Sequence, residues 1–295
     1  MSEVLRGLGS LLLATALVTG CKGSASNSSG ASASSASPQQ AAAGKSGAPL
    51  AVGAPGSNVV GNAGTSAWDS LSDKEAVRTF GTLYLHQSVG QDLEDGAEAL
   101  GYKFEYYGPD HQRGQATAQG LNGGIFTDVA GVANGAPMEK MAAVRKALAT
   151  HKSRLKVLFF SFGYADVQEQ DLPAVEAAYA KLVADVKAAG LRFVHVTPPL
   201  VYSVAENPPK MKMRTWMLET FKGDTIFDLQ DIESTQDGKR CEVGGVWRIC
   251  QGNRSTTTCP SKGQGIDEEG AGHICATRAK VFAKALLFAI HRAGR

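Results

Sequence analysis

The sequence predicts an α/β fold for residues 67–295, a three-layer α/β/α sandwich with a mostly parallel central sheet. Short runs rich in β-branched and aromatic residues alternate with longer segments whose apolar residues recur at spacings of three and four. Strands that alternate with helices in this way favour a parallel sheet covered on both faces. The run Val-Leu-Phe-Phe at 157–160 is continuously apolar, which is typical of a strand buried on both faces.

The expected elements follow one another along the chain. Strands are expected over residues 82–85, 103–107, 157–160, 193–196 and 225–227. Helices are expected over residues 92–100, 137–150, 172–189, 211–221 and 275–293. The clearest helix follows Asp171 as N-cap and stops at Gly190. Because sites in such sheets form beyond the carboxyl ends of the strands, Ser88 and the loop 163–166 are expected at the same edge.

The first 20 residues follow the plan of a signal peptide. A weakly basic start at Arg6 precedes an apolar run over residues 8–18 and the small residues Thr19 and Gly20. The run is shorter than the roughly 20 residues that span a hydrocarbon core of about 30 Å, which disfavours a retained transmembrane helix. The segment is therefore expected to be removed on export.

The tetrapeptide Val-Thr-Gly-Cys at 18–21 resembles the bacterial lipobox. The resemblance implies cleavage before Cys21, attachment of fatty acids such as palmitate, and anchoring in a membrane of the cell envelope. Lys22 stands where retention in the inner membrane requires an aspartate, so the outer membrane is expected in a Gram-negative cell. An ordinary secretory peptide with a cysteine at this position is the alternative.

Residues 22–66 consist almost wholly of Ser, Ala, Gly, Pro, Asn and Gln and have no periodic apolar face. Such a segment cannot bury enough surface to offset the entropy lost on ordering. We therefore expect residues 21–66 to be a lipidated, disordered tether that carries a single domain at 67–295. As a flexible coil the tether has a root-mean-square reach of about 35–40 Å.

The 30 basic and 28 acidic residues nearly balance, and the basic residues form no stripe interleaved with aromatics. Nucleic acid is therefore not expected as a partner. Separately, the chain is expected to be a monomer.

The cysteines after Cys21 all lie in the last quarter of the chain. They are Cys241, Cys250, Cys259 and Cys275. An even number of cysteines in an exported chain predicts two disulfides, whose pairing the sequence leaves open. A zinc site is the alternative, which the absence of a Cys-x-x-Cys spacing disfavours. No metal and no organic cofactor is expected.

Ser88 and His273 are the residues best placed for nucleophilic catalysis. Ser88 follows a strand and begins the loop that enters a helix, and Val89 and Gly90 allow close approach of the backbone. His273 lies in a glycine-rich loop with carboxylates upstream, and a serine needs such a base to become a nucleophile. The alternatives are that Ser88 only caps the helix and that His273 is a solvated loop residue.

Five segments resemble, in order, the blocks of the SGNH (GDSL-type) hydrolase superfamily. They are Leu-His-Gln-Ser-Val-Gly at 85–90, Gly-Val-Ala-Asn-Gly at 131–135, Phe-Gly-Tyr-Ala-Asp at 162–166, His-Val-Thr-Pro-Pro-Leu at 195–200 and Gly-His at 272–273. The resemblance covers nearly the whole folded domain and implies a flavodoxin-like sandwich. It also implies Ser88 as nucleophile, His273 as base and Gly131 as a donor to the oxyanion.

Two positions depart from the family pattern. Ala165 stands where the family has its oxyanion asparagine, and Gly270 stands where it has an aspartate three residues before the histidine. Loss of one oxyanion donor costs roughly 10²–10³ in rate unless another group replaces it. We expect Asn134 to supply the missing amide and Asp267 to orient His273.

The sequence therefore predicts an envelope serine esterase or acyl hydrolase, acting on a small-molecule or polysaccharide ester. The two departures motivate an alternative from another class, an SGNH-fold lipoprotein that binds a glycan or envelope partner with little or no catalysis. His195 is expected to be a core histidine, and Asp228 and Glu233 are expected to be solvated loop carboxylates.

Overall fold

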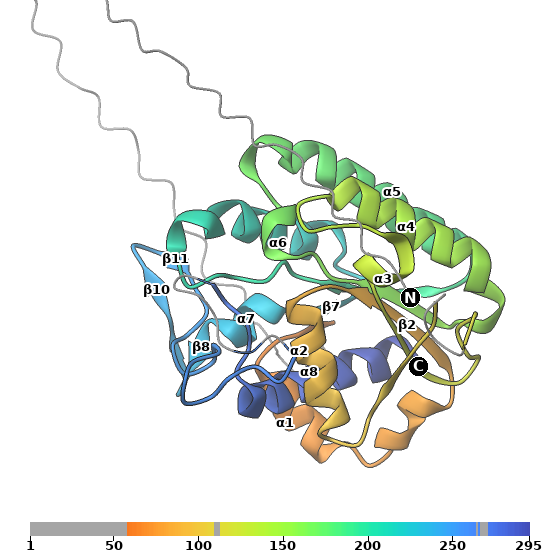
Figure 1. Cartoon of the computed structure of the whole chain (residues 1–295), viewed down its shortest axis with the longest axis horizontal. Helices are drawn as coiled ribbons and strands as arrows, with labels where there is room; N and C mark the ends of the chain where they lie inside the picture. Colours follow the sequence, from red (N-terminus) through yellow and green to blue (C-terminus); the bar gives the residue numbers. More distant parts are fainter. Residues whose placement is uncertain (1–57, 109–112, 264, 266–270) are drawn as a thin grey trace, which may run out of the picture. The chain divides into compact units, whose positions relative to one another are not determined.

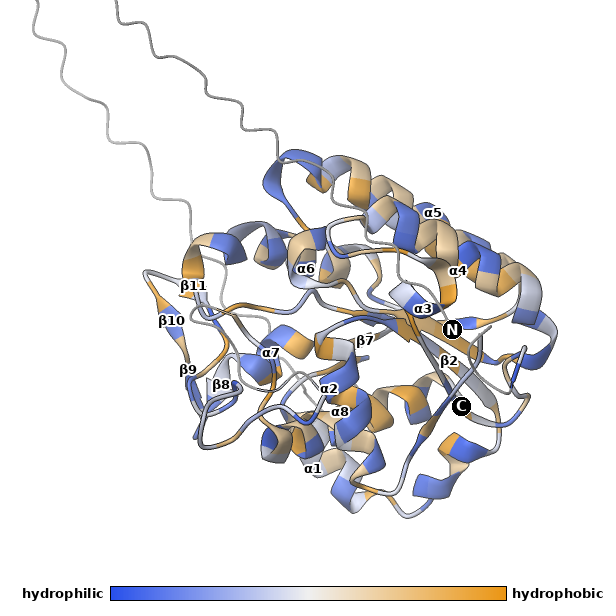
Figure 2. Ribbon diagram, viewed as in Figure 1, coloured by the Kyte–Doolittle hydropathy of each residue, from blue (hydrophilic) through white to orange (hydrophobic). Residues whose placement is uncertain are grey.

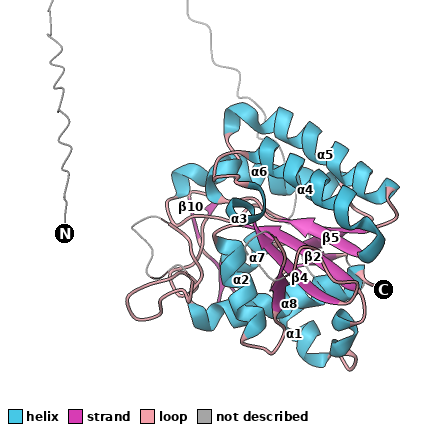
Figure 3. Ribbon diagram, turned by 45° about the vertical axis from the view of Figure 1, so that its right-hand side comes forward, coloured by secondary structure: helices cyan, strands magenta, loops and turns pink. Residues whose placement is uncertain are grey.

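The computed structural model describes residues 58–108, 113–263, 265 and 271–295. Cys21 and the segment 1–57, with the predicted signal peptide and most of the predicted tether, lie outside the described residues. The described part is an α/β structure whose central sheet lies between two layers of helices (Figures 1 and 3).

The central sheet has seven strands in the order β1-β7-β6-β5-β2-β4-β3, and all its neighbouring pairs are parallel. Its strands are β1 (Val59–Val60), β2 (Gly81–His86), β3 (Phe104–Tyr106), β4 (Gly120–Ile125), β5 (Val157–Phe160), β6 (Arg192–Val196) and β7 (Thr225–Phe227). After β2 the chain places β3 at one edge of the sheet, returns with β4 between β3 and β2, and then crosses to the other side of β2 with β5. The carboxyl end of β2 is therefore a topological switch point, where open α/β sheets form their sites.

Helices cover both faces of the sheet. The described α-helices are α1 (Ala63–Ser70), α2 (Val89–Glu98), α3 (Phe126–Ala130), α4 (Pro137–His151), α5 (Leu172–Ala188), α6 (Asn207–Thr220), α7 (Leu229–Glu233) and α8 (Ala276–Ala293). In Figure 3, α4, α5 and α6 lie on one side of the strands and α1 and α8 on the other. The predicted three-layer α/β/α arrangement is confirmed.

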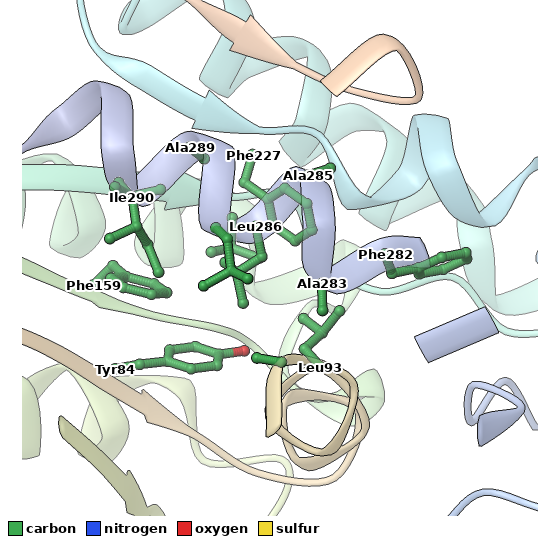
Figure 4. Close-up of a cluster of buried hydrophobic side chains, with 14 of the residues drawn as sticks. Tyr84, Leu93, Phe159, Phe227, Phe282, Ala283, Ala285, Leu286, Ala289 and Ile290 are labelled. Carbon is green, nitrogen blue, oxygen red and sulfur yellow. The ribbon is translucent and has the colours of Figure 1, made fainter. Parts of the chain in front are cut away.

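Two hydrophobic clusters, one on each face, hold the layers together. Side chains alternate between the faces along β2: Tyr84 joins the cluster against α8, whereas Leu83 and Leu85 join the cluster against α4 and α5. Figure 4 shows Tyr84 and Phe159 of the sheet facing the apolar side of α8. Figure 2 shows hydrophobic residues gathered in the central strands, whereas α4 and α5 carry both hydrophobic and hydrophilic residues.

The folded body begins before the predicted boundary at residue 67. Val59 and Val60 pair with β7, and α1 places Trp68 in the core with 3% of its surface exposed. The Ser/Ala/Gly composition around these residues hid them, because two valines and one tryptophan are too few to give a periodic signal.

Strand β4 was also missed by the sequence pattern, because three of its six residues are glycine. A side chain at Gly123 would overlap Glu94 of α2 and the ring of Tyr106 on β3. Glycine at this position therefore allows α2 and β3 to approach the strand closely.

The C-terminal quarter carries two disulfides, which join Cys241 to Cys250 and Cys259 to Cys275. The predicted disulfides are confirmed and their pairing is defined. Two short hairpins precede α8, β8 (Thr235–Gln236) with β9 (Lys239–Arg240) and β10 (Glu242–Val243) with β11 (Val246–Trp247).

Within the described ranges no helix is both long and apolar enough to cross a membrane. The same ranges contain no group of three or more His, Cys, Asp or Glu side chains arranged to hold a metal ion.

Candidate active site

Ser88 lies in a sharp turn between β2 and α2, at the switch point of the sheet. Its φ is 58° and its ψ is −113°, a backbone conformation that residues with a side chain rarely adopt. Strained conformations of this kind persist where the surrounding structure enforces them, and they cluster at functional sites. A serine on a strained strand-to-helix turn exposes its hydroxyl above the sheet.

The packing below the turn explains the glycine two residues later. A side chain at Gly90 would overlap that of His86, the last residue of β2. His86 is fully buried, and its Nε2 lies 3.0 Å from Glu94 Oε1 and 3.3 Å from the Tyr106 hydroxyl. The first turn of α2 therefore sits directly on a buried polar cluster at the end of β2.

His273 reaches Ser88 because α8 packs closely along α2. Gly96 makes this approach possible, since a side chain there would overlap the backbone of Ala279. His273 lies three residues before α8, and its Nε2 is 3.0 Å from Ser88 Oγ. Its ring is 15% exposed and meets the Tyr164 ring edge-on at a centroid distance of 5.6 Å.

The carboxylate on His273 belongs to Asp92. Its Oδ2 lies 2.9 Å from His273 Nδ1 and also accepts the Ile274 N–H at 2.9 Å, while Oδ1 accepts the Ser261 hydroxyl. The Asp92 side chain is fully buried. With the Nδ1 proton donated to Asp92, His273 Nε2 is left as an acceptor for the Ser88 hydroxyl. Ser88, His273 and Asp92 thus form a continuous hydrogen-bonded chain.

Asp267, the residue expected to orient His273, lies outside the described residues. Sequence reasoning missed Asp92 because it placed the start of the helix at residue 92, whereas α2 begins at Val89. On a helix that begins there, Asp92 lies one turn after Ser88 and faces the same side. The spacing Ser-x-x-x-Asp across a strand-to-helix turn was the available signal.

Asn134 lies beside the loop that carries Ala165. Asp166 ties the two segments together: Oδ1 accepts the Gly135 N–H at 2.8 Å, and Oδ2 accepts the Gly163 N–H and the Lys140 ammonium, the latter at 2.6 Å. Lys140 and Asp166 are fully buried, and burial lowers the pKa of Lys140 while the Asp166 carboxylate opposes that shift. Removing either partner would leave an uncompensated buried charge.

The contacts of Asp166 with Gly135, Gly163 and Lys140 also orient the Asn134 amide. Its Oδ1 lies 3.5 Å from Lys140 Nζ and would touch a side chain at Gly163. The oxygen end therefore faces the ion pair. Among described residues no partner accepts a hydrogen bond from Asn134 Nδ2, so the donor end is available for a ligand.

Gly131 does not offer its N–H to a ligand. It ends α3 with φ 66°, and its N–H donates to Thr127 O at 3.0 Å. The residue is glycine because of this left-handed helix end, since a side chain would meet nothing within 4 Å. The predicted role of Gly131 in the oxyanion site is therefore wrong, because its donor is already used.

The remaining polar residues have structural positions. His195 is fully buried between the Tyr179 hydroxyl at 3.1 Å and Asp224 at 3.1 Å, as expected for a core histidine, and burial lowers its pKa. The expectation that Asp228 and Glu233 are solvated is wrong, because both are fully buried. Burial raises the pKa of Glu233 well above its usual value, although its carboxylate accepts a backbone N–H.

No protein-family model matches this chain, and no curated protein is significantly similar to it.

Proposed function

We propose that the chain is a serine esterase or acyl hydrolase of the SGNH type. The observation that carries the proposal is the hydrogen-bonded chain Ser88–His273–Asp92 at the carboxyl end of β2. A serine hydroxyl needs a base within hydrogen-bond reach, and the base needs a third group to fix its tautomer. Both contacts of this chain are 3.0 Å or shorter, and the second is made to a fully buried carboxylate.

In the proposed reaction Ser88 Oγ attacks the acyl carbon of an ester while His273 Nε2 takes the hydroxyl proton. The imidazolium is stabilised by Asp92, and it then gives this proton to the departing alcohol. A water molecule, deprotonated in turn by His273, attacks the acyl-enzyme and releases the carboxylic acid and free Ser88. The same proton path thus serves both halves of the reaction.

Two donors are proposed for the oxyanion. The Ser88 N–H makes no hydrogen bond to another described residue, because Ser88 is the N-cap of α2. The Asn134 amide is the second donor, brought to the loop of Ala165 by the Asp166 contacts. Donors fixed before the reaction stabilise the charge that develops in the transition state.

A polar substrate suits the surroundings better than a long acyl chain. A cavity of about 460 Å³ lies beside α2. Its lining includes Gln91, which lies one helical turn after Ser88. Its lining is dominated by charged and polar side chains, which are Gln91, Glu94, Asp95, Glu98, Lys103, Glu105 and Arg113. Hydroxyl groups of a carbohydrate find hydrogen-bond partners on such a wall. With the lipobox-like segment at Cys21, this favours an acylated envelope or extracellular polymer.

The test is hydrolysis of soluble acetyl esters, with acetylated oligosaccharides and p-nitrophenyl acetate compared with p-nitrophenyl palmitate. The proposal expects turnover of the acetyl esters that disappears in Ser88→Ala, with little activity on the palmitate. Turnover that survives in Ser88→Ala would contradict it.

A glycan- or envelope-binding protein without efficient catalysis is the second candidate. Ala165 favours it, because the family's side-chain donor is missing at this position. Binding of acetylated oligosaccharide by wild type and Ser88→Ala alike, with no turnover of any ester, would select this candidate.

A further inference from the structure

Five exposed basic side chains gather at the amino ends of three neighbouring strands. They are Lys152, Arg154, Lys156, Arg192 and Lys222, and we call this group the basic edge. The first two form the short helix between α4 and β5, Lys156 directly precedes β5, Arg192 begins β6, and Lys222 lies between α6 and β7. The Arg192 N–H donates to Lys156 O at 2.9 Å, and β6 pairs with β7, so the group is continuous across the sheet.

None of these five side chains forms an ion pair with another described residue. The contrast with their neighbours is clear, since Lys187 pairs with Asp224 and Arg295 pairs with Asp73. Basic residues at helix ends often offset the helix dipole, but Lys156, Arg192 and Lys222 lie outside the helices. Lys156 also lies over the Phe80 ring, 5.5 Å from its centroid. The basic edge therefore presents positive charge that no described carboxylate neutralises.

The basic edge concentrates positive charge on one side of a body whose basic and acidic residues are equal in number. Three of the 30 basic and one of the 28 acidic residues of the chain precede Asn58, which leaves 27 of each sign from there on. A body with no net charge and a positive edge is a dipole. Such a body is oriented by a negatively charged surface more than it is attracted from a distance.

A hollow of about 630 Å³ opens at the same edge. Its basic lining residues are Lys187, Arg192, Arg292 and Arg295, and Asp224 is the acidic residue of the lining, held by Lys187 at 2.5 Å. Asn58 also lines the hollow, and its Oδ1 accepts a hydrogen bond from Arg292 at 3.1 Å. The described body thus begins at the edge that carries the unpaired charge.

From these observations we propose that the basic edge docks on an anionic membrane surface. Lys and Arg beside an anionic leaflet each strengthen binding about fivefold, so five such residues form an effective docking surface. A membrane is favoured over a soluble polyanion because Asn58, the first described residue, lies at this edge, and Cys21, the predicted lipidation site, precedes it in the sequence.

Docking in this way turns the candidate active site away from the membrane. Ser88 follows the carboxyl end of β2, whereas the basic edge lies at the amino ends of the strands parallel to it. Six residues of strand separate the two edges by roughly 20 Å at about 3.3 Å per residue. This consequence rests on the proposed function: the esterase would act on a polymer above the membrane and not on the lipids that hold it.

The test measures co-sedimentation of residues 22–295, without lipid, on vesicles of phosphatidylcholine with and without phosphatidylglycerol. Two double variants change the net charge equally. Arg192→Glu with Lys222→Glu alters the basic edge. Lys181→Glu with Lys280→Glu alters exposed residues on α5 and α8 that form no ion pair with a described residue. Hydrolysis of a soluble acetyl ester is measured on the same samples.

The wild type is expected to bind only the anionic vesicles, and less at high salt. The edge variant should bind them at least about 30-fold more weakly, because it loses two contributions of about fivefold each and gains two carboxylates that the anionic surface repels. The control variant should bind within about threefold of wild type, and both variants should retain esterase activity. Equal weakening by both variants, or binding of heparin without binding of anionic vesicles, would overturn the membrane assignment, whatever the esterase assay shows.

Discussion

Replacement of Asp92 by asparagine should nearly abolish catalysis while leaving the fold intact. The buried carboxylate accepts three hydrogen bonds, from the His273 ring, the Ile274 N–H and the Ser261 hydroxyl. An asparagine can place its oxygen toward only some of these donors. If its amide nitrogen faces His273, the ring must accept at Nδ1 and carry its proton on Nε2, where it can no longer take the proton of Ser88.

The expected loss in kcat is about 10⁴-fold, the cost of the wrong tautomer in a serine–histidine–carboxylate site. At about 1.4 kcal/mol per tenfold this is roughly 5.5 kcal/mol of transition-state stabilisation. KM should change little, because Asp92 is buried and does not reach the substrate. The assay is steady-state hydrolysis of p-nitrophenyl acetate, with thermal unfolding measured on the same sample.

Asp185→Asn is the control, because it makes the same chemical change on another helix, α5, outside both the hydrogen-bonded chain of Ser88 and the cavity beside α2. Its kcat should stay within a few-fold of wild type. The reasoning would be refuted if Asp92→Asn kept more than about a tenth of wild-type kcat, and Asp267 would become the orienting group if Asp267→Asn lost activity instead.

Three further predictions concern the donors, a buried acid and a disulfide. Asn134→Ala should lower kcat by roughly 10²–10³-fold, and adding Ala165→Asn should restore part of it, because the second change returns an amide to the neighbouring loop. Glu233→Gln should stabilise the fold at neutral pH but not near pH 4, as measured by urea unfolding at several pH values. The pKa of Glu233 is raised in the folded state, so the folded chain holds a proton there that the unfolded chain releases. The stability of the wild type therefore falls as pH rises above the ordinary pKa of a glutamate, and the glutamine variant does not share this loss. Removal of the Cys259–Cys275 disulfide by serine substitution should lower the free energy of unfolding by about 3 kcal/mol, since the disulfide closes a loop of about 16 residues. It should also lower kcat, because that loop supplies the Ser261 and Ile274 donors to Asp92.

Each of these predictions has an outcome that contradicts it. Unchanged kcat in Asn134→Ala would remove Asn134 from the oxyanion site. A stability difference for Glu233→Gln that is independent of pH would mean that the carboxyl is not protonated in the fold. Removal of the Cys241–Cys250 disulfide is the control for removal of the Cys259–Cys275 disulfide. An equal loss of kcat in the two variants would show that the whole C-terminal quarter is destabilised and that the effect is not specific to Asp92.

Periodicity predicted the layers well because each helix and buried strand has a long or strongly apolar pattern. The continuous run at 157–160 is β5, and the helix expected over 172–189 is α5 within one residue. The pattern failed where backbone packing, not side-chain burial, determines the strand. Gly123 is needed because α2 and β3 approach it, and no apolar periodicity records that need.

The candidate site was only partly predicted, because its members come from different parts of the chain and not all of them carry a local signal. Ser88 and His273 carry local signals, a strand end and a glycine-rich loop, and the structure brings them together. Asp92 was missed through an error of three residues in the start of α2, which is within the usual uncertainty of helix boundaries predicted from sequence. Gly131 was misassigned because a glycine that ends a helix and a glycine that donates to a ligand look alike in sequence.

The most direct test of the central claim is covalent labelling with a fluorophosphonate, followed by intact mass and peptide mapping. The proton relay from Ser88 to His273 predicts one adduct per folded chain, located on Ser88, that is lost in Ser88→Ala and strongly slowed in His273→Ala. A folded wild-type chain that takes up no adduct, or takes it up at a residue other than Ser88, would contradict the assignment of this site as a serine hydrolase.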